Sequence, residues 1–232
     1  MRRATLSLTL LALLAVGASR AGAEGFDVRI GAYFPRGNET LFQDDRDLYL
    51  VGKSDFNGVY GGVEYNHTLI DNVEIGIHLD GYGRTVNTSY RNYERPDGGG
   101  EIQQSLKVWA APLGLTVRLV PTSKRAKVAP YVGGGIDAIF WGYEEYGDFI
   151  DFNDPGLAIS SDHFTSNGTA LGFHVLGGFR VYVNRDFAVV GEGRYQWAKE
   201  DMGDDFAPRE PGLVNTIDLT GATFTLGVHV RF

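Results

Sequence analysis

Apolar and polar residues alternate with a period of two along several segments of the chain, and the clearest example is the last one. From Ala222 to Phe232 every second residue is apolar, and the residues between them are Thr, Gly, His or Arg. A period of two places successive side chains on opposite faces of a β-strand. The pattern therefore predicts a strand with one apolar face and one polar face.

Eight segments share this alternation, and they predict an all-β chain. They are Phe26–Phe34, Phe56–Leu69, Val73–Val86, Ser105–Val120, Val128–Tyr143, Thr169–Val183, Phe187–Lys199 and Leu219–Phe232. The connections between them alternate between long and short. The long ones are Pro35–Asp55, Asn87–Gln104, Glu144–Gly168 and Glu200–Asp218, and the short ones are Ile70–Asn72, Pro121–Lys127 and Asn184–Asp186.

This order of loop lengths predicts an eight-stranded antiparallel up-and-down transmembrane β-barrel. Bacterial outer-membrane barrels have an even number of strands, short turns on the periplasmic side and longer loops outside. The last segment also has the roughly 9–11 residues that a tilted strand needs to cross a bilayer. The alternative is a soluble β-sandwich or lipocalin-like barrel, which has no reason to alternate its loop lengths in this way.

The N-terminus predicts export from the cytoplasm. Met1-Arg2-Arg3 is positively charged, Ala4–Gly17 is mostly apolar, and Ala21-Gly22-Ala23 has the small-residue pattern of a cleavage site. These are the three parts of a secretory signal peptide. We therefore expect residues 1–23 to be a signal peptide and residues 24–232 to be the barrel domain.

Composition excludes some classes of function. The chain has no cysteine, so disulfide and thiolate chemistry are absent, and its formal net charge is −8. That charge disfavours nucleic acid as a partner. We expect no cofactor.

The polar faces of the predicted strands carry charges of both signs. A charged side chain that faces lipid costs roughly 2–4 kcal/mol at the bilayer midplane, so these residues must face the lumen. An eight-stranded barrel leaves an interior that side chains can fill. We predict a packed network without a wide pore, although a gated path for ions or solutes remains open. The expected members are Arg29, Glu64, Glu74, His78, Asp80, Arg84, Arg118, Asp137, Arg180, Glu192, Arg194 and Arg231.

Aromatic residues are expected to form the two belts at the membrane interfaces. Those near the short turns are Tyr131, Phe187 and Phe232, and those near the long loops are Phe34, Trp109, Phe140, Trp141, Tyr195 and Trp197.

The chain resembles the small outer-membrane β-barrel superfamily of the OmpA transmembrane domain, OmpX and OmpW type. The signal peptide, the start Phe26–Pro35, the strand Ala129–Ile136 and the terminal Phe232 carry this resemblance. It implies a Gram-negative outer membrane as the location. The implied partners are outer-membrane lipids, lipopolysaccharide and the barrel insertion machinery, which would recognise Phe232 as an assembly signal. It leaves the external ligand open.

The expected function is a structural or interaction role through the four long extracellular loops. The alternatives are a narrow passage for ions or small apolar solutes, or a lipid A-modifying enzyme. We predict no enzymatic activity and no catalytic residues, because the nearest match to a lipid A deacylase element, His163 to Asn167, has one residue too many. That extra residue places His163 and Ser166 on opposite faces of a strand.

The connection from Glu144 to Gly168 is the most acidic segment, with six carboxylates and no Lys or Arg. Hard cations such as Ca²⁺ need several oxygen ligands. A divalent-cation site is therefore one interpretation, and a solvated acidic loop is the other. The candidate oxygen donors are Asp148, Asp151, Asp154 and Asp162.

Overall fold

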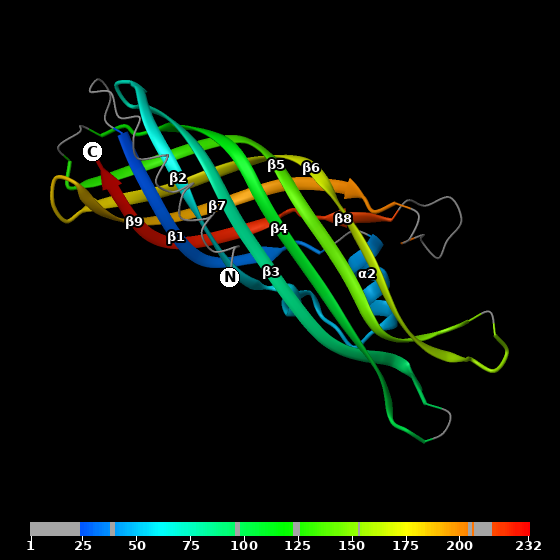
Figure 1. Ribbon diagram of the computed structural model, residues 1–232. Helices are drawn as coiled ribbons and strands as arrows, with labels where there is room; N and C mark the ends of the chain where they lie inside the picture. Colours follow the sequence, from blue (N-terminus) through cyan, green and yellow to red (C-terminus); the bar gives the residue numbers. More distant parts are fainter. Residues whose placement is uncertain are drawn as a thin grey trace, which may run out of the picture.

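Eight antiparallel strands close into a barrel in the computed structural model (Figure 1). The structure describes residues 24–37, 40–95, 98–122, 126–152, 154–203, 206 and 215–232; the predicted signal segment 1–23 lies outside them. The strands of the ring are β1 (Glu24–Pro35), β2 (Gly58–Ile70), β3 (Val73–Glu94), β4 (Glu101–Leu119), β5 (Val128–Ile150), β6 (Ile159–Tyr182), β7 (Phe187–Asp201) and β9 (Gly221–Arg231). The predicted fold class is confirmed.

Each strand of the ring pairs with two neighbours. The ring is closed by β1 and β9, whose register runs from Gly25 opposite Arg231 to Pro35 opposite Gly221. Closure matters because a backbone in lipid has no water to bond, so all its N–H and C=O groups must be paired within the protein. A short strand, β8 (Thr216–Asp218), continues the pairing with β7 beyond β9.

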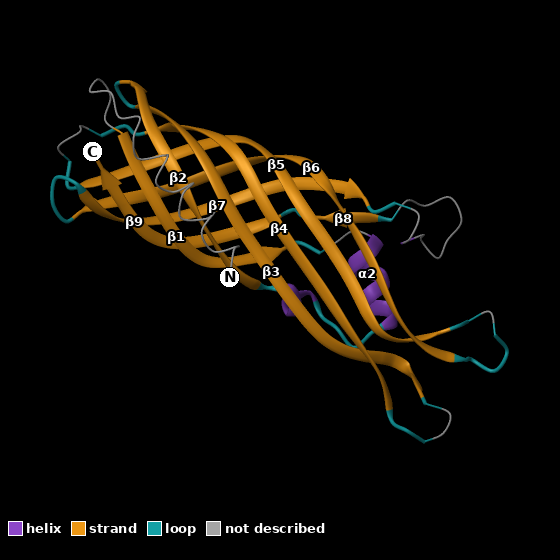
Figure 2. Ribbon diagram, in the orientation of Figure 1, coloured by secondary structure: helices purple, strands orange, loops and turns teal. Residues whose placement is uncertain are grey.

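The outer surface of the barrel is apolar and the lumen is polar. On β1, for example, Val28 and Ile30 are more than half exposed, whereas Asp27 and Arg29 are buried. The same alternation runs along the neighbouring strands, so exposed apolar side chains surround the barrel. Figure 2 shows that strands make up nearly the whole barrel wall. Among the described residues no helix is long and apolar enough to cross a membrane.

Two of the predicted long loops are largely strand, which corrects their extent. The β3–β4 ladder continues to the pair Glu94–Glu101, and the β5–β6 ladder continues to Ile150–Ile159. Figure 1 shows both hairpins projecting well beyond the barrel. Alternation does not predict these extensions, because both faces of a strand outside the bilayer can be exposed to water and need not differ in polarity.

The first long connection also differs from a simple loop. It contains the helix α2 (Thr40–Leu48) and the 3-10 helix η1 (Lys53–Phe56). Their apolar residues Leu41, Phe42 and Phe56 are buried in the extracellular mouth of the barrel. The predicted loop is therefore an inward-folded lid.

Two residues assigned to the aromatic belts face the lumen instead. Tyr131 is 2% exposed and Trp141 is 1% exposed, whereas Trp109 and Phe140 remain on the outer surface. The physical reason is strand parity, since Trp141 lies on the same face of β5 as the buried Ile139 and Tyr143. Grouping by position along a strand failed here because it ignored which face each ring occupies.

Candidate functional site

The lumen has a charged layer towards the short turns and an apolar layer towards the long hairpins. We call the charged layer the lumen network. Its members are linked by ion pairs and hydrogen bonds and come from all strands of the ring; they are Asp27, Arg29, Glu64, Glu74, His78, Asp80, Arg118, Asp137, His174, Arg180, Glu192, Arg194 and His229.

Two arginines and two glutamates form the centre of this network. Arg29 Nη1 lies 2.6 Å from Glu192 Oε1 and 2.9 Å from Glu64 Oε2. Arg118 Nη1 lies 2.6 Å from Glu64 Oε1, and its Nη2 lies 3.0 Å from Glu192 Oε2. Each carboxylate thus bridges both guanidinium groups. Paired and hydrogen-bonded charges are the form in which buried charges are tolerated.

Tyr131 of β5 completes this centre. Its ring centroid is 5.1 Å from the guanidinium carbon of Arg118 and 5.3 Å from that of Arg180, within the range of cation–π contacts. Its hydroxyl donates a hydrogen bond of 3.0 Å to Glu192 Oε2. The strands make room with small residues; a Cβ at Gly76 would lie 2.1 Å from Glu64 Oε1.

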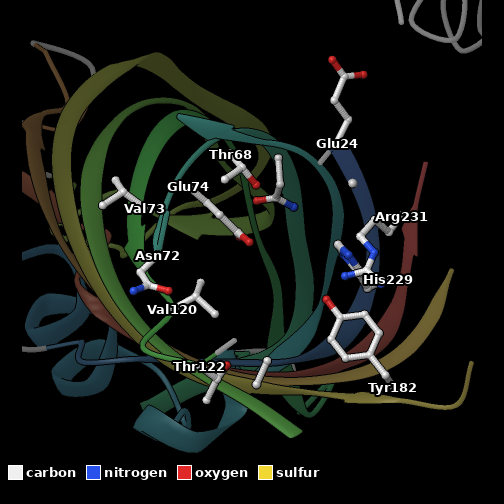
Figure 3. Close-up of a pocket in the computed structure, with 13 residues that line it drawn as sticks. Glu24, Thr68, Asn72, Val73, Glu74, Val120, Thr122, Tyr182, His229 and Arg231 are labelled. Atoms are coloured by element: carbon white, nitrogen blue, oxygen red, sulfur yellow. The ribbon is translucent and has the colours of Figure 1, made fainter. Parts of the chain in front are cut away.

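The network ends near the short turns at a small polar cavity of about 60 Å³ (Figure 3). Glu74, Tyr182 and His229 lie around it, and Arg231 lies at its rim. Above it, His229 Nδ1 is 2.5 Å from Asp27 Oδ1, and Arg180 Nη1 is 2.8 Å from Glu74 Oε2. The cavity lies at the short-turn end of the barrel and stops at these pairs.

Most of the lumen residues expected from the sequence come together in this network, but two do not. Arg84 is exposed near the long-loop mouth of the barrel, where its Nε donates a hydrogen bond of 2.7 Å to the carbonyl oxygen of Asp55. Arg231 bonds the carbonyl of Arg185 at the opposite end. Both have inward parity, but Arg84 lies in the half of β3 towards the long hairpins, away from the network, and Arg231 lies at the end of β9. The expected set also missed Asp27, Asn66 and Thr116. They share faces with Arg29, Glu64 and Arg118, so parity alone could have found them.

An apolar plug fills the lumen above the network, which the sequence did not predict. Its buried core includes Leu41, Phe42, Phe56, Leu106, Ile139, Trp141, Tyr143 and Ile217. The rings of Phe42 and Phe56 meet edge to face with centroids 4.9 Å apart. Helix α2 supplies Leu41 and Phe42, so the plug joins the folded-in first connection to the barrel wall.

Two acidic side chains lie at the top of the plug, of which Asp45 is buried and Glu145 is half-buried. The Tyr143 oxygen lies 3.0 Å from both Asp45 Oδ2 and Glu145 Oε1. Burial, together with the nearby Glu145, raises the pKa of Asp45 well above its usual value. The Tyr143 hydroxyl has one proton, so it can donate to only one of the two carboxyl groups at a time. These contacts tie α2 to β5.

The four carboxylates proposed as a cation site do not converge. Asp148 pairs with Arg95 and accepts from Ser161 at 2.6 Å, and Asp154 accepts from the Gly156 N–H at 3.0 Å. Asp162 accepts from the His163 N–H at 2.8 Å, and Asp151 is exposed. In the described part of the chain, no three of them bring ligand atoms together. The extended hairpin keeps them apart along its length.

Comparison with known proteins agrees with this architecture. The family described as outer membrane protein beta-barrel domain matches residues 6–232. The chain is similar to the outer membrane protein OprG from Pseudomonas aeruginosa, with 15% identity, a TM-score of 0.51, and coverage of 91% of this chain and 97% of that one. Its fold is therefore shared with OprG.

Two further structures have weaker similarity. Neisserial surface protein A has 14% identity and a TM-score of 0.47, over 90% of this chain and 97% of that one. Outer membrane protein W of E. coli has 21% identity and a TM-score of 0.42, over 92% and 100%. No curated protein sequence matches the chain.

Proposed function

Because this chain belongs to the outer membrane protein β-barrel domain family, we propose that it is a non-conducting outer-membrane anchor whose two long hairpins bind an extracellular protein. The outer membrane, with its lipid and lipopolysaccharide, is the location of the family. The observation that carries the proposal is the pair of hairpins, which form one surface beyond a lumen occupied by the apolar plug and the lumen network.

The packed lumen argues against a passage. An ion would first have to displace the plug around Trp141 and then separate the arginines and carboxylates of the lumen network. Removing one partner of a buried ion pair costs several kcal/mol. A conducting state would thus need the barrel to lose most of its interior contacts, which makes a structural or interaction role the better interpretation.

The two hairpins behave as one sheet outside the bilayer. β4 and β5 stay paired up to Gln104 opposite Gly147. The Gln104 side chain of the β3–β4 hairpin donates a hydrogen bond of 2.5 Å to the carbonyl oxygen of Asp148 in the β5–β6 hairpin. The Asp148 carboxylate also forms an ion pair with Arg95 of the β3–β4 hairpin. These contacts hold the two hairpins together, so a partner meets a preformed surface.

Aromatic side chains are exposed on this sheet. Tyr93, Tyr146, Phe152 and Phe164 are 36–49% exposed, and Tyr93 contacts Phe152 with ring centroids 5.4 Å apart. Exposed aromatic groups away from the lipid cost solvation energy and are typical of protein-binding surfaces. Tyr146 lines a groove of about 720 Å³, whose other lining residues are mostly polar and include Gln103 and Asp148. The exposed contact pair of Tyr93 and Phe152 is the feature that favours a protein partner.

The first test is conductance. The purified barrel is reconstituted in planar bilayers, and the proposal expects no channel currents above those of protein-free bilayers. Reproducible single-channel steps would contradict a non-conducting anchor and favour the passage.

The second test is surface binding. Cells that display the wild type are assayed on immobilised extracellular-matrix and serum proteins, and the double variant Tyr93→Ser/Phe152→Ser is expected to reduce retention about tenfold, the effect of losing two central aromatic contacts. Ser160→Ala, in the same hairpin, is the matched control. Equal retention by both variants would refute the binding surface.

The lipid A-modifying alternative lacks a matching constellation. His163 is exposed and faces Glu144 at 3.6 Å, whereas the Ser166 hydroxyl donates 2.6 Å to the carbonyl of Met202. The two side chains therefore do not share a face. The mass of lipid A from cells with and without the protein should be identical, and a mass change would favour an enzyme.

A further inference from the structure

We propose that His78, Asp137 and His174 form an internal site for one divalent transition-metal ion, with Zn²⁺ as the test ion. The three residues come from β3, β5 and β6, and their ligand atoms all lie within 4.8 Å of one another. His78 Nε2 is 3.0 Å from Asp137 Oδ1, and His174 Nδ1 is 2.7 Å from Asp137 Oδ2. Two imidazoles and one carboxylate are a common ligand set for zinc and for first-row metals generally.

The hydrogen bonds around the two imidazoles agree with metal ligation. The Thr116 oxygen lies 3.3 Å from His78 Nδ1 and 3.1 Å from His174 Nε2, the ring nitrogens that point away from Asp137. When an ion occupies the other two ring nitrogens, both of these carry protons. A hydroxyl oxygen has two lone pairs, so Thr116 can accept both bonds. Such bonds orient ligating histidines in metalloproteins.

A buried oxygen without a partner points into the site. Asp137 is 3% exposed, and its Oδ1 has no hydrogen bond to any described residue although His78 Nε2 is close. The same His78 nitrogen lies 3.0 Å from Arg194 Nη1, from which it can accept. When His78 Nε2 accepts from Arg194, it presents no proton to Asp137 Oδ1, and a cation between the two atoms would bond to both lone pairs.

The charge of the surroundings also favours a cation. Within the described part of the lumen network, the carboxylates Asp27, Glu64, Glu74, Asp80, Asp137 and Glu192 outnumber the guanidinium groups Arg29, Arg118, Arg180 and Arg194. Uncompensated charge is costly in a sealed interior. Arg194 is itself held by Asp80 at 2.9 Å and Glu192 at 3.3 Å, so it need not bond His78.

The backbone leaves space for this cluster. A Cβ on Gly114 would lie 2.0 Å from Asp137 Oδ1 and 2.5 Å from His78 Cε1. The plug closes the lumen above the site and the rest of the network closes it below. An ion would therefore enter while the barrel forms and would exchange slowly afterwards.

The experiment follows from that sealed position. The chain is refolded into detergent micelles with Zn²⁺ or with a chelator, free metal is removed, and zinc is measured by elemental analysis. Wild type refolded with Zn²⁺ should retain about one ion per chain, and Asp137→Asn and His174→Gln should lose at least about 90% of it. His163→Gln, at an exposed histidine outside the site, is the matched control and should retain zinc as the wild type does.

The folded state of each variant is checked by its mobility on gels without boiling. If a variant does not fold, Co²⁺ substitution of the wild type decides the question, since tetrahedral coordination by nitrogen and oxygen gives an intense visible absorption. No retained zinc in the wild type, equal zinc in Asp137→Asn, or a Co²⁺ spectrum of the free hydrated ion would each overturn the proposal.

Discussion

The hydroxyl of Tyr33 donates a hydrogen bond of 2.6 Å to the carbonyl oxygen of Leu219. Leu219 lies in the break between β8 and β9, where the ladder with β7 is interrupted. Gln196 Nε2 donates to the same oxygen at 2.8 Å. A carbonyl that leaves the ladder thus points into the lumen and is satisfied by two side chains, at the level where the lumen network meets the plug.

We expect Tyr33→Phe to lower the free energy of unfolding by about 1 kcal/mol, the usual net worth of a buried hydrogen bond. The loss is modest because Gln196 still bonds the Leu219 carbonyl. The double variant Tyr33→Phe/Gln196→Leu should cost more than the sum of the two single variants, since it leaves this carbonyl without a partner. Urea unfolding in lipid vesicles measures both. Strict additivity would show that the two donors do not share one acceptor.

Arg118→Met should be strongly destabilising, by about 3–5 kcal/mol, because it leaves Glu64 and Glu192 short of a buried partner. Arg84→Met, at the exposed end of the same charge pattern, should change the free energy of unfolding by well under 1 kcal/mol. The same unfolding assay compares them. Similar small effects at both positions would mean that the lumen network adds no specific stability.

The docking of α2 should weaken as pH rises. Burial and Glu145 raise the pKa of Asp45, so the docked state binds this proton more tightly than the undocked state. The Asp45 carboxyl therefore stabilises the docked state fully at pH values below the ordinary Asp pKa of about 3.9. This stabilisation is lost as pH rises through the raised pKa of the docked state. Protease cleavage in the first connection should therefore increase from pH 4.5 to 7.5, and Asp45→Asn should remove that dependence.

The control for this prediction is Asp47→Asn, because Asp47 is exposed on the same helix. It should keep the pH dependence of the wild type. If Asp45→Asn and Asp47→Asn behave alike, the buried carboxyl of Asp45 does not govern the docking.

Deletion of Phe232 should reduce the amount of protein in the outer membrane more than the amount exported to the periplasm. Its side chain is 59% exposed, and its backbone pairs with Glu24 at 3.0 and 3.3 Å. Phe232→Tyr keeps an aromatic terminus and the backbone bonds, and it should assemble normally. Cell fractionation measures both variants, and normal outer-membrane levels after the deletion would exclude Phe232 as an assembly signal.

Strand parity predicted the lumen well where the outer face meets lipid. Arg29, Glu64 and Arg118 alternate with apolar neighbours because lipid penalises any other arrangement. Parity could not show which charges pair, since Arg29 and Glu192 are 163 residues apart and meet only across the closed ring. Parity also could not separate Arg84 from the network, because alternation shows which face of a strand a residue occupies but not how far along the barrel axis it lies.

The sequence by itself determined the closed barrel, the number of strands in its ring, and which side chains of each strand face lipid and which face the lumen. These follow from local alternation and from the requirement that lipid meets only apolar side chains and paired backbone. Only the tertiary structure decided that α2 folds into the mouth, that Trp141 lies in a plug, and that His78, Asp137 and His174 share one site. Contacts across the lumen join residues far apart in sequence, so their partners are set by the closure and stagger of the ring and not by any local pattern.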